Sequence, residues 1–235
     1  MLNAIGLQNP GVDTFIERDI PFLKKYDTKI IVNVCGHSKE EYLNVVRKLA
    51  WQPVDLLEIN ISCPNVKAGG ITFGTDARAV EDITRSVKEA AGQPIIMKLS
   101  PNVTDITEMA KAAEAGGADG ISLINTITGM KIDVERQTFV LANKTGGLSG
   151  PAIHPVAVRM VYECAKAVSI PIIGMGGVAD ASDALELLLA GATLVSVGTM
   201  NFYEPQTAIR VIDGIEAYME RHGIADVNDL IGAVR

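Results

Sequence analysis

The sequence predicts an α/β fold, a (β/α)8 TIM barrel, with about six of the eight strand-helix units visible in its 235 residues. Two observations lead to this prediction. Short apolar segments alternate with longer amphipathic segments along the chain, which is typical of parallel strands joined by helices. Glycine-rich turns follow the last two of these strands, where a barrel of this kind usually binds phosphate.

The predicted strands are apolar throughout, so we expect them to be buried on both faces of one parallel sheet. They lie at about 29–34, 55–60, 94–99, 119–125, 171–174 and 193–197. Each is followed by a segment with polar residues on one face, and several of these begin at a residue that can cap a helix. The predicted helices are Lys39–Leu49, Asp76–Ala91, Thr104–Ala115, Pro155–Val168, Ala181–Leu189 and Pro205–Arg221.

The glycine turns favour a closed barrel over an open doubly wound sheet. No Gly-x-Gly-x-x-Gly motif follows an early strand. Instead Gly174-Met175-Gly176-Gly177 and Gly198-Thr199 follow the fifth and sixth predicted strands, so backbone amides at two neighbouring strand ends can hold one phosphate. If these are the barrel's last two strands, two units are missing at the front. We therefore expect one barrel domain over residues 1–235, incomplete at its N-terminus.

Two segments show no helical or strand periodicity. The chain opens in a loop from Gly6 to Gly11, and segment 126–150 is irregular over its whole length. Irregular segments this long are usually functional lids or disordered. We expect 126–150 to be a mobile cover over the site.

The composition restricts the classes of function. Hydrophobic residues make up 48% of the chain, which suffices for a full core. A net charge of −7 argues against a nucleic-acid surface, and no window approaches the ~20 apolar residues of a membrane span. Three cysteines form no disulfide framework and no signal segment is present, so a reducing cytoplasm is expected. No Cys-x-x-Cys motif occurs and the three histidines are scattered, so no metal site is expected.

The segment from Asn60 to Asn65, Asn-Ile-Ser-Cys-Pro-Asn, carries the strongest functional signal. Cys63 falls just beyond a predicted strand, because Pro64 cannot continue a ladder. A thiol there can act as nucleophile, metal ligand or proton-transfer group, and asparagine suits the edge of an amide or imide. Alternatively, Asn60 and Asn65 satisfy turn backbone while Cys63 is a small buried hydrophobe.

Lys98 ends the predicted strand 94–99 on the same side as Ile96. The alternation that turns Ile95 and Met97 toward the helices turns Lys98 into the barrel. There it can be a fixed cation near developing negative charge, a Schiff-base amine, or a salt-bridged structural lysine.

Other polar residues also close predicted strands. Asn33 ends the first visible strand, and Asn125-Thr126 ends the fourth. Each alone is as well explained by a capped turn. Six polar residues in all fall at or just past C-terminal strand ends, which independent turn roles explain poorly: Asn33, Asn60, Cys63, Asn65, Lys98 and Asn125.

Four further residues with reactive side chains receive no role. Cys35 has no polar company, and Cys164 lies on the inner face of a predicted helix, where it is most simply core. His37 and His154 begin predicted helices and are expected to be solvated or capping residues.

On these residues the chain resembles the class 1 dihydroorotate dehydrogenases over nearly its whole length, from Asn3–Gly11 to Gly198-Thr199. The Asn-x-Ser-Cys-Pro-Asn loop is highly specific to that family. The resemblance implies an FMN-containing (β/α)8 barrel that oxidises (S)-dihydroorotate to orotate in pyrimidine (UMP) biosynthesis. It also implies that Cys63 is the catalytic base and that Lys98 faces the flavin edge where reduction builds negative charge.

The resemblance also assigns ligands residue by residue. Substrate binding is implied for Asn3, Ala4, Ile5, Gly6, Leu7, Asn9, Asn60, Asn65, Asn125 and Thr126. FMN binding is implied for Asn33, Asn60, Lys98, Ile124, Gly150, Gly176, Gly177, Gly198 and Thr199.

Segment Asn125–Asp133 resembles the NAD-linked heteromeric branch, class 1B. In that branch the catalytic subunit pairs with an electron-transfer subunit that carries FAD and a [2Fe-2S] cluster. Two catalytic subunits are expected to associate as a homodimer. The chain departs from the family at its front, where about two strands and a flavin-contacting lysine are missing. Two alternatives therefore stay open: a Schiff-base aldolase that uses Lys98, and a non-catalytic truncated fragment.

Overall fold

The computed structural model describes residues 1–62 and 73–234. The chain divides into two compact units. Unit 1 comprises Met1–Ala4, Ser100–Thr107 and Ser122–Arg235, and unit 2 comprises Ile5–Leu99 and Glu108–Ile121.

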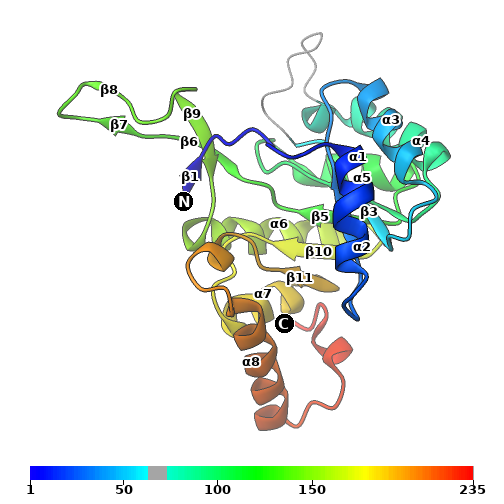
Figure 1. Cartoon of the computed structure of the whole chain (residues 1–235). Helices are drawn as coiled ribbons and strands as arrows, with labels where there is room; N and C mark the ends of the chain where they lie inside the picture. Colours follow the sequence, from blue (N-terminus) through cyan, green and yellow to red (C-terminus); the bar gives the residue numbers. More distant parts are fainter. Residues whose placement is uncertain (63–72, 235) are drawn as a thin grey trace. The chain divides into compact units, whose positions relative to one another are not determined.

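Unit 2 is built on a parallel sheet (Figure 1). Strand β3 (Leu56–Asn60) lies between β2 (Ile31–Val34) and β4 (Ile95–Lys98). The Asp119 amide donates to the Ile95 carbonyl at 2.9 Å, so Asp119 lies beside the start of β4. Strand β5 (Gly120–Leu123) begins at the next residue. These strands agree with the predicted ones, each within two residues at its ends.

Amphipathic helices cover one face of this sheet. Helix α3 (Lys39–Leu49) begins at Ser38, whose hydroxyl accepts from the Glu41 amide, and α4 (Ala77–Ala90) begins at Asp76 in the same way. Their buried residues meet a sheet face formed by Leu57, Ile59, Ile95 and Met97, all with no exposed surface. Helix α5 (Ile106–Ala115) belongs to unit 2 from Glu108 onward.

The first residues of unit 2 form an irregular helix that the sequence analysis did not predict. It consists of α1 (Val12–Thr14), a π-helical turn (Phe15–Asp19) and α2 (Ile20–Leu23). Among its residues only Ile20 is buried. The apolar residues Val12, Phe15, Ile16, Ile20 and Leu23 do recur at helical spacing, so this signal was present in the sequence and was overlooked.

Two aspartates fix the starts of neighbouring strands in unit 2. Asp55 accepts from the Ile30 amide at 2.8 Å and from the Lys29 ammonium at 3.1 Å. Asp119 accepts from the Ile95 amide at 2.7 Å and from an ammonium group of α4. The backbone hydrogen bond and the nearby lysine hold the pKa of Asp55 below its usual range.

Unit 1 carries a second group of parallel strands, β10 (Ile172–Met175) and β11 (Leu194–Ser196). The Ile124 amide donates to the Met175 carbonyl at 2.9 Å, so the chain leaving β5 runs beside β10. Helices α6 (His154–Ala167), α7 (Ala181–Ala190) and α8 (Thr207–His222) follow the pattern that the sequence predicts. Short 3-10 turns precede or follow them at Pro151–Ile153, Thr199–Phe202 and Val227–Leu230.

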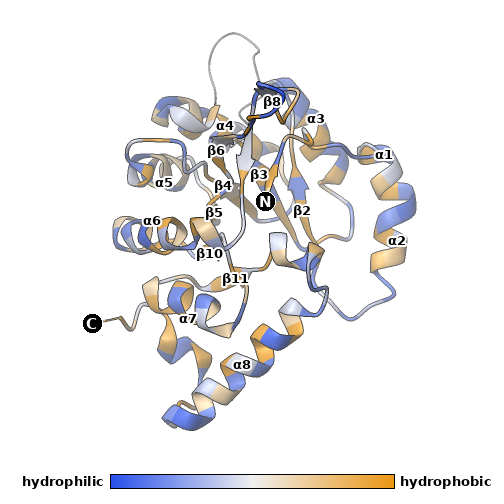
Figure 2. Cartoon of the chain, turned by 90° about the vertical axis from the view of Figure 1, so that its left-hand side faces the viewer, coloured by the Kyte–Doolittle hydropathy of each residue, from blue (hydrophilic) through white to orange (hydrophobic). Residues whose placement is uncertain are grey.

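Helix α7 is the apolar centre of this part of unit 1. It begins with a capping box between Asp180 and Asp183, and Leu185 and Leu188 pack with Leu230 in one cluster. Helix α8 is more exposed, and Figure 2 shows hydrophobic and hydrophilic residues mixed along its length. No helix in the described part of the chain is long and apolar enough to cross a membrane.

Segment 126–150 is regular, so the expectation of an irregular segment is wrong. Strands β6 (Ile127–Met130) and β9 (Thr145–Leu148) pair antiparallel, and β1 (Leu2–Asn3) adds to the other edge of β9. Two short strands, β7 (Ile132–Asp133) and β8 (Thr138–Phe139), close the far end. Figure 1 shows this arm projecting as a narrow ribbon. Its role as a cover stays a prediction.

Candidate active site

A row of polar side chains crosses the sheet of unit 2 on the face opposite to α3 and α4. Parallel pairing places Asn33 opposite Glu58, and Asn60 opposite Lys98. Side chains of paired residues point to the same face of a sheet, and residues two apart on one strand share that face. The row therefore contains all four residues. The prediction that Lys98 points away from the helices is confirmed.

Glu58 lies at the centre of this row. The Asn33 amide donates to Glu58 Oε2 at 2.5 Å, and the Lys98 ammonium lies 3.5 Å from the same oxygen. The Glu58 side chain is 11% exposed and that of Lys98 is 19% exposed. Lys98 is thus both inward-facing and ion-paired, and the pair places a balanced charge in a poorly solvated setting.

Asn60 connects the row to the loop that follows β3. Its side-chain amide lies 3.4 Å from the Asn33 carbonyl oxygen, and its own oxygen accepts from the Ser62 hydroxyl at 2.8 Å. The Tyr42 hydroxyl donates to the Asn60 backbone carbonyl at 2.6 Å. These contacts fix the plane of the Asn60 amide, so that its donor and acceptor have defined directions.

The predicted residues Cys63 and Asn65 lie outside the described residues. The chain on either side of them is well anchored. Ser62 is buried, and a Cβ at Gly74 would lie only 2.7 Å from the Ile61 carbonyl oxygen, so only glycine fits there. The two ends of this loop therefore lie against each other, next to Asn60.

The predicted substrate segment 3–9 is divided between the units. Asn3 pairs with Gly147 in the arm of unit 1, and Ala4 follows it there. Ile5, Gly6, Leu7 and Asn9 belong to unit 2.

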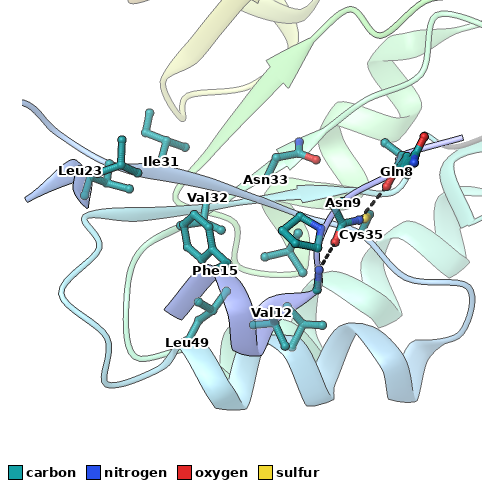
Figure 3. A pocket seen from close by; sticks show the side chains of 16 residues that line it. Gln8, Asn9, Val12, Phe15, Leu23, Ile31, Val32, Asn33, Cys35 and Leu49 are labelled. Carbon is teal, nitrogen blue, oxygen red and sulfur yellow. Dashed lines mark hydrogen bonds between the residues drawn. The ribbon is translucent and has the colours of Figure 1, made fainter. Parts of the chain in front are cut away.

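Leu7 and Asn9 line a cavity of about 480 Å³ in unit 2, together with Asn33, Cys35 and the β2 strand (Figure 3). The Asn9 side chain bridges its own turn, because it donates to the Leu7 carbonyl and accepts from the Gly11 amide at 2.9 Å. The Asn9 side chain therefore stabilises the backbone of its own turn. Its role toward a substrate stays a prediction.

In unit 1, Asn125 and Thr126 lie at the base of the arm. The Asn125 side chain accepts from the Thr126 amide at 2.7 Å. Asn102 holds the next residues: its amide donates to the Thr126 carbonyl at 3.0 Å and accepts from the Thr128 amide at 2.9 Å. A single asparagine thus replaces a strand partner at the start of β6. Nothing in the sequence near Asn102 predicts this contact.

The glycine turns of unit 1 come together as predicted. β10 and β11 are parallel neighbours, so the turns that follow them emerge at one edge. A Cβ at Gly177 would lie 2.9 Å from the Gly150 carbonyl oxygen, and the Thr199 hydroxyl donates to that of Ser149 at 2.7 Å. Within the described residues, the amides of Gly177, Gly198 and Thr199 donate no hydrogen bond to the protein. Such unused amides and a hydroxyl are the donors that a phosphate needs.

His154 begins α6 beside these turns. It is buried, so the expectation of a solvated residue is wrong. Its ring nitrogen Nδ1 lies 2.8 Å from the Gly176 carbonyl oxygen. Nε2 lies 3.6 Å from carboxylate oxygens of both Asp183 and Glu186. The ring is buried because the turn and the start of α7 close over it, which helix position alone does not indicate.

Among the remaining reactive residues, Cys35 lines the cavity with Asn9 and Asn33, which differs from its expected lack of polar neighbours. His37 is exposed and Cys164 is fully buried in α6. Burial raises the pKa of the Cys164 thiol to about 12, which makes it unreactive at neutral pH. The described residues contain no group of three histidine, cysteine or acidic side chains placed to hold a metal ion.

Comparisons with known proteins identify the family of the chain. A family model described as dihydroorotate dehydrogenase matches residues 1–219. The chain belongs to the dihydroorotate dehydrogenase family. A dihydroorotate dehydrogenase B (NAD(+)) catalytic subunit from Lachnoclostridium phytofermentans is 64% identical over 235 residues, which are all of this chain and 78% of that protein. The subunit of the same name from Alkaliphilus metalliredigens is 61% identical over 234 residues, again with 78% of its length matched.

A crystal structure of a dihydroorotate dehydrogenase from Eimeria tenella in complex with ferulenol has the same fold. It superposes with a TM-score of 0.81 at 23% identity, and the match covers 99% of this chain and 70% of that one. The expectation of an α/β barrel fold is thereby confirmed. Family membership gives no support to the Schiff-base aldolase.

Proposed function

We propose that this member of the dihydroorotate dehydrogenase family oxidises (S)-dihydroorotate to orotate, a step of pyrimidine biosynthesis, with FMN as the hydride acceptor. The observation that carries the proposal is the row Asn33–Glu58–Asn60–Lys98, which leads into the loop of Cys63. Amides and an ion pair on three neighbouring strands would provide recognition of a planar substrate, and the thiol of Cys63, three residues after Asn60 in the sequence, would provide proton transfer.

The residues of unit 1 fit a flavin phosphate. Unused amides at Gly177, Gly198 and Thr199 supply donors, and close packing against Gly150 and His154 requires a glycine at position 177. FMN, when bound, accepts the hydride. Ile124, Gly150 and Gly176 would lie along it, as the family resemblance implies.

Lys98 and Glu58 have distinct roles in this proposal. Lys98 supplies a positive charge where negative charge develops on reduction of the flavin. Glu58 keeps the ammonium in place, because its carboxylate lies 3.5 Å away and is itself held by Asn33. A cation fixed before the reaction does not have to reorganise during it, which is the source of its catalytic effect.

Cys63 is the proposed base that removes a proton from the substrate. A thiol with an ordinary pKa of ~8.5 is mostly protonated at neutral pH, so the rate should rise with pH until the thiolate dominates. Asn60, Asn65, Asn125 and Thr126 would hold the pyrimidine. The hydrogen bond from Ser62 orients the Asn60 amide for this purpose.

The electrons leave through a partner in this proposal. Relatives are named as catalytic subunits of an NAD(+)-linked enzyme, which implies a second subunit. We propose that this partner carries FAD and a [2Fe-2S] cluster and that two catalytic subunits associate as a homodimer. Cysteines without a disulfide framework support a cytoplasmic location.

The test uses the full chain, supplied with FMN and freed of unbound flavin. Anaerobic addition of dihydroorotate should bleach the flavin and yield one orotate per flavin, and Cys63→Ala should slow bleaching by about 10²-fold or more. Cys164→Ala, which alters a buried thiol far in sequence from the loop, serves as the control and should leave the rate unchanged. Failure to bind FMN, or binding without bleaching, would overturn the proposal.

A further inference from the structure

His154 has contacts that a solvated or merely capping histidine does not need. Its side chain is 7% exposed, and it is the first residue of α6, next to the turn that follows β10. We propose that His154 is a positioning residue for the cofactor phosphate and that it acts through the Gly176–Gly177 peptide. This inference rests on the proposed use of FMN.

The direction of the hydrogen bond follows from its partner. A carbonyl oxygen only accepts, so the 2.8 Å contact with Gly176 requires a proton on His154 Nδ1. The other nitrogen faces Asp183 Oδ1 and Glu186 Oε2 at 3.6 Å. Asp183 is held in turn, because its second oxygen accepts from the Ala179 amide at 2.7 Å. The ring is thus placed between the turn and the first residues of α7.

The contact with Gly176 sets the direction of one of the unused amides. The Gly176 carbonyl and the Gly177 amide belong to one planar peptide group, in which C=O and N–H point in opposite directions. When His154 binds the carbonyl, the Gly177 N–H therefore points away from the histidine. This N–H donates no hydrogen bond within the described protein, so it remains available to an anion.

Packing leaves this peptide little freedom to turn over. A Cβ on Gly177 would lie 2.7 Å from the His154 Cβ, and one on Gly176 would lie 2.9 Å from the Ala157 Cβ. The turn therefore lies directly on the first turn of α6. The histidine ring adds a directional contact at the Gly176 carbonyl to this close packing.

The test compares ligands that differ only in the phosphate. In the full chain, His154→Leu removes the donor, and His154→Asn retains an amide nitrogen near the position of Nδ1. We expect His154→Leu to weaken FMN binding about tenfold, as loss of one oriented donor to an anion does, and to change riboflavin binding less than about twofold. His154→Asn should restore FMN affinity to within about threefold of the parent chain.

Several outcomes would overturn the proposal. Equal weakening of FMN and riboflavin by His154→Leu would show a general structural role, and unchanged FMN affinity would show no role. A variant that fails to fold is replaced by His154→Asn and His154→Gln, because the amide nitrogen of glutamine lies near the position of Nε2. His154→Gln should then bind FMN more weakly than His154→Asn.

A ligand-free measurement separates this inference from the proposed function. Nitrogen-15 NMR of the His154 ring should show a protonated Nδ1 whose proton exchanges slowly with water, since it is buried and hydrogen-bonded. If the parent chain binds no FMN but this proton is present, the proposed cofactor is wrong and the contact stands. A ring without a proton on Nδ1 would refute the positioning role whatever the chain binds.

Discussion

The ion pair between Glu58 and Lys98 should be a net stabilising contact, unlike a surface ion pair. The two charges lie 3.5 Å apart, which corresponds to a gross attraction of about 5 kcal/mol at an effective dielectric constant of ~20. Removing both groups from water offsets much of this. We expect a net coupling free energy of about 2 kcal/mol.

A double-mutant cycle measures this coupling. Lys98→Met should lower the free energy of unfolding by about 3 kcal/mol, because it removes the ammonium group that neutralises the buried Glu58 carboxylate. Glu58→Gln should cost less, about 1–2 kcal/mol, because the longer Lys98 side chain can extend toward water. Urea unfolding followed by circular dichroism gives the free energies of the parent, both single variants and the double variant.

The control is an exposed ion pair in the same unit. Glu81 and Arg85 lie one turn apart on α4, with side chains 40% and 57% exposed. Their cycle, with Glu81→Gln and Arg85→Met, should give a coupling of about 0.5 kcal/mol or less. A coupling for the Glu58–Lys98 pair no larger than that of the surface pair would refute the claim that Glu58 holds the ammonium in place.

Three further predictions follow from local geometry. Gly177→Ala should lower the free energy of unfolding by about 2 kcal/mol, because the φ of Gly177 is +75° and its new Cβ would meet the start of α6. The control Gly198→Ala places its Cβ in open space and should lower it by less than about 0.5 kcal/mol. Equal losses for the two variants in urea unfolding would contradict this prediction. Asn102→Ala should increase proteolytic cleavage of the arm several-fold relative to Asn143→Ala, because it removes two hydrogen bonds to the backbone at the base of the arm. Equal cleavage of the two variants would show that Asn102 does not hold the arm. Because the pKa of Asp55 is lowered in the folded state, its carboxylate stabilises the fold above the unfolded-state pKa of about 3.9, and this stabilisation is lost as the pH falls through the lower folded-state pKa. Asp55→Asn should therefore make the free energy of unfolding depend less steeply on pH below about pH 4. An unchanged slope would contradict this prediction.

Most helices and parallel strands could be predicted because their signals are local. Ser38 caps α3 and the apolar stripe of Tyr42, Val46 and Leu49 ends with the helix, so the predicted bounds Lys39–Leu49 match the observed ones. The residues of β3 and β4 that face the helices, Leu57, Ile59, Ile95 and Met97, are apolar and fully buried, which gives both strands a clear signal in the sequence.

The arm could not be predicted because its pairing is not local. Strand β9 depends on β1, because Leu148 of β9 pairs with Leu2 of β1. Strand β6 depends on hydrogen bonds from the side chain of Asn102. Short strands rich in glycine and polar residues have no periodicity of their own. The contacts that order them come from distant parts of the sequence.

The candidate site was predicted in part. Parity along strand 94–99 placed Lys98 on the correct face, yet Glu58 was overlooked although it lies two residues before Asn60 in an otherwise apolar strand. An acidic residue in a buried strand is itself a signal, because burial of a charge requires a partner. His154 gave no such signal, since its burial depends on the turn after β10 and on α7.

The most direct test of the proposed chemistry is the pH dependence of flavin bleaching. The full chain, loaded with FMN, is mixed anaerobically with saturating dihydroorotate at pH values from about 6 to 9. With Cys63 as the base, the rate should rise about tenfold per pH unit at the acidic end and level off as the thiolate forms. A rate that stays flat over this range, or a Cys63→Ala chain that bleaches as fast as the parent, would contradict the account.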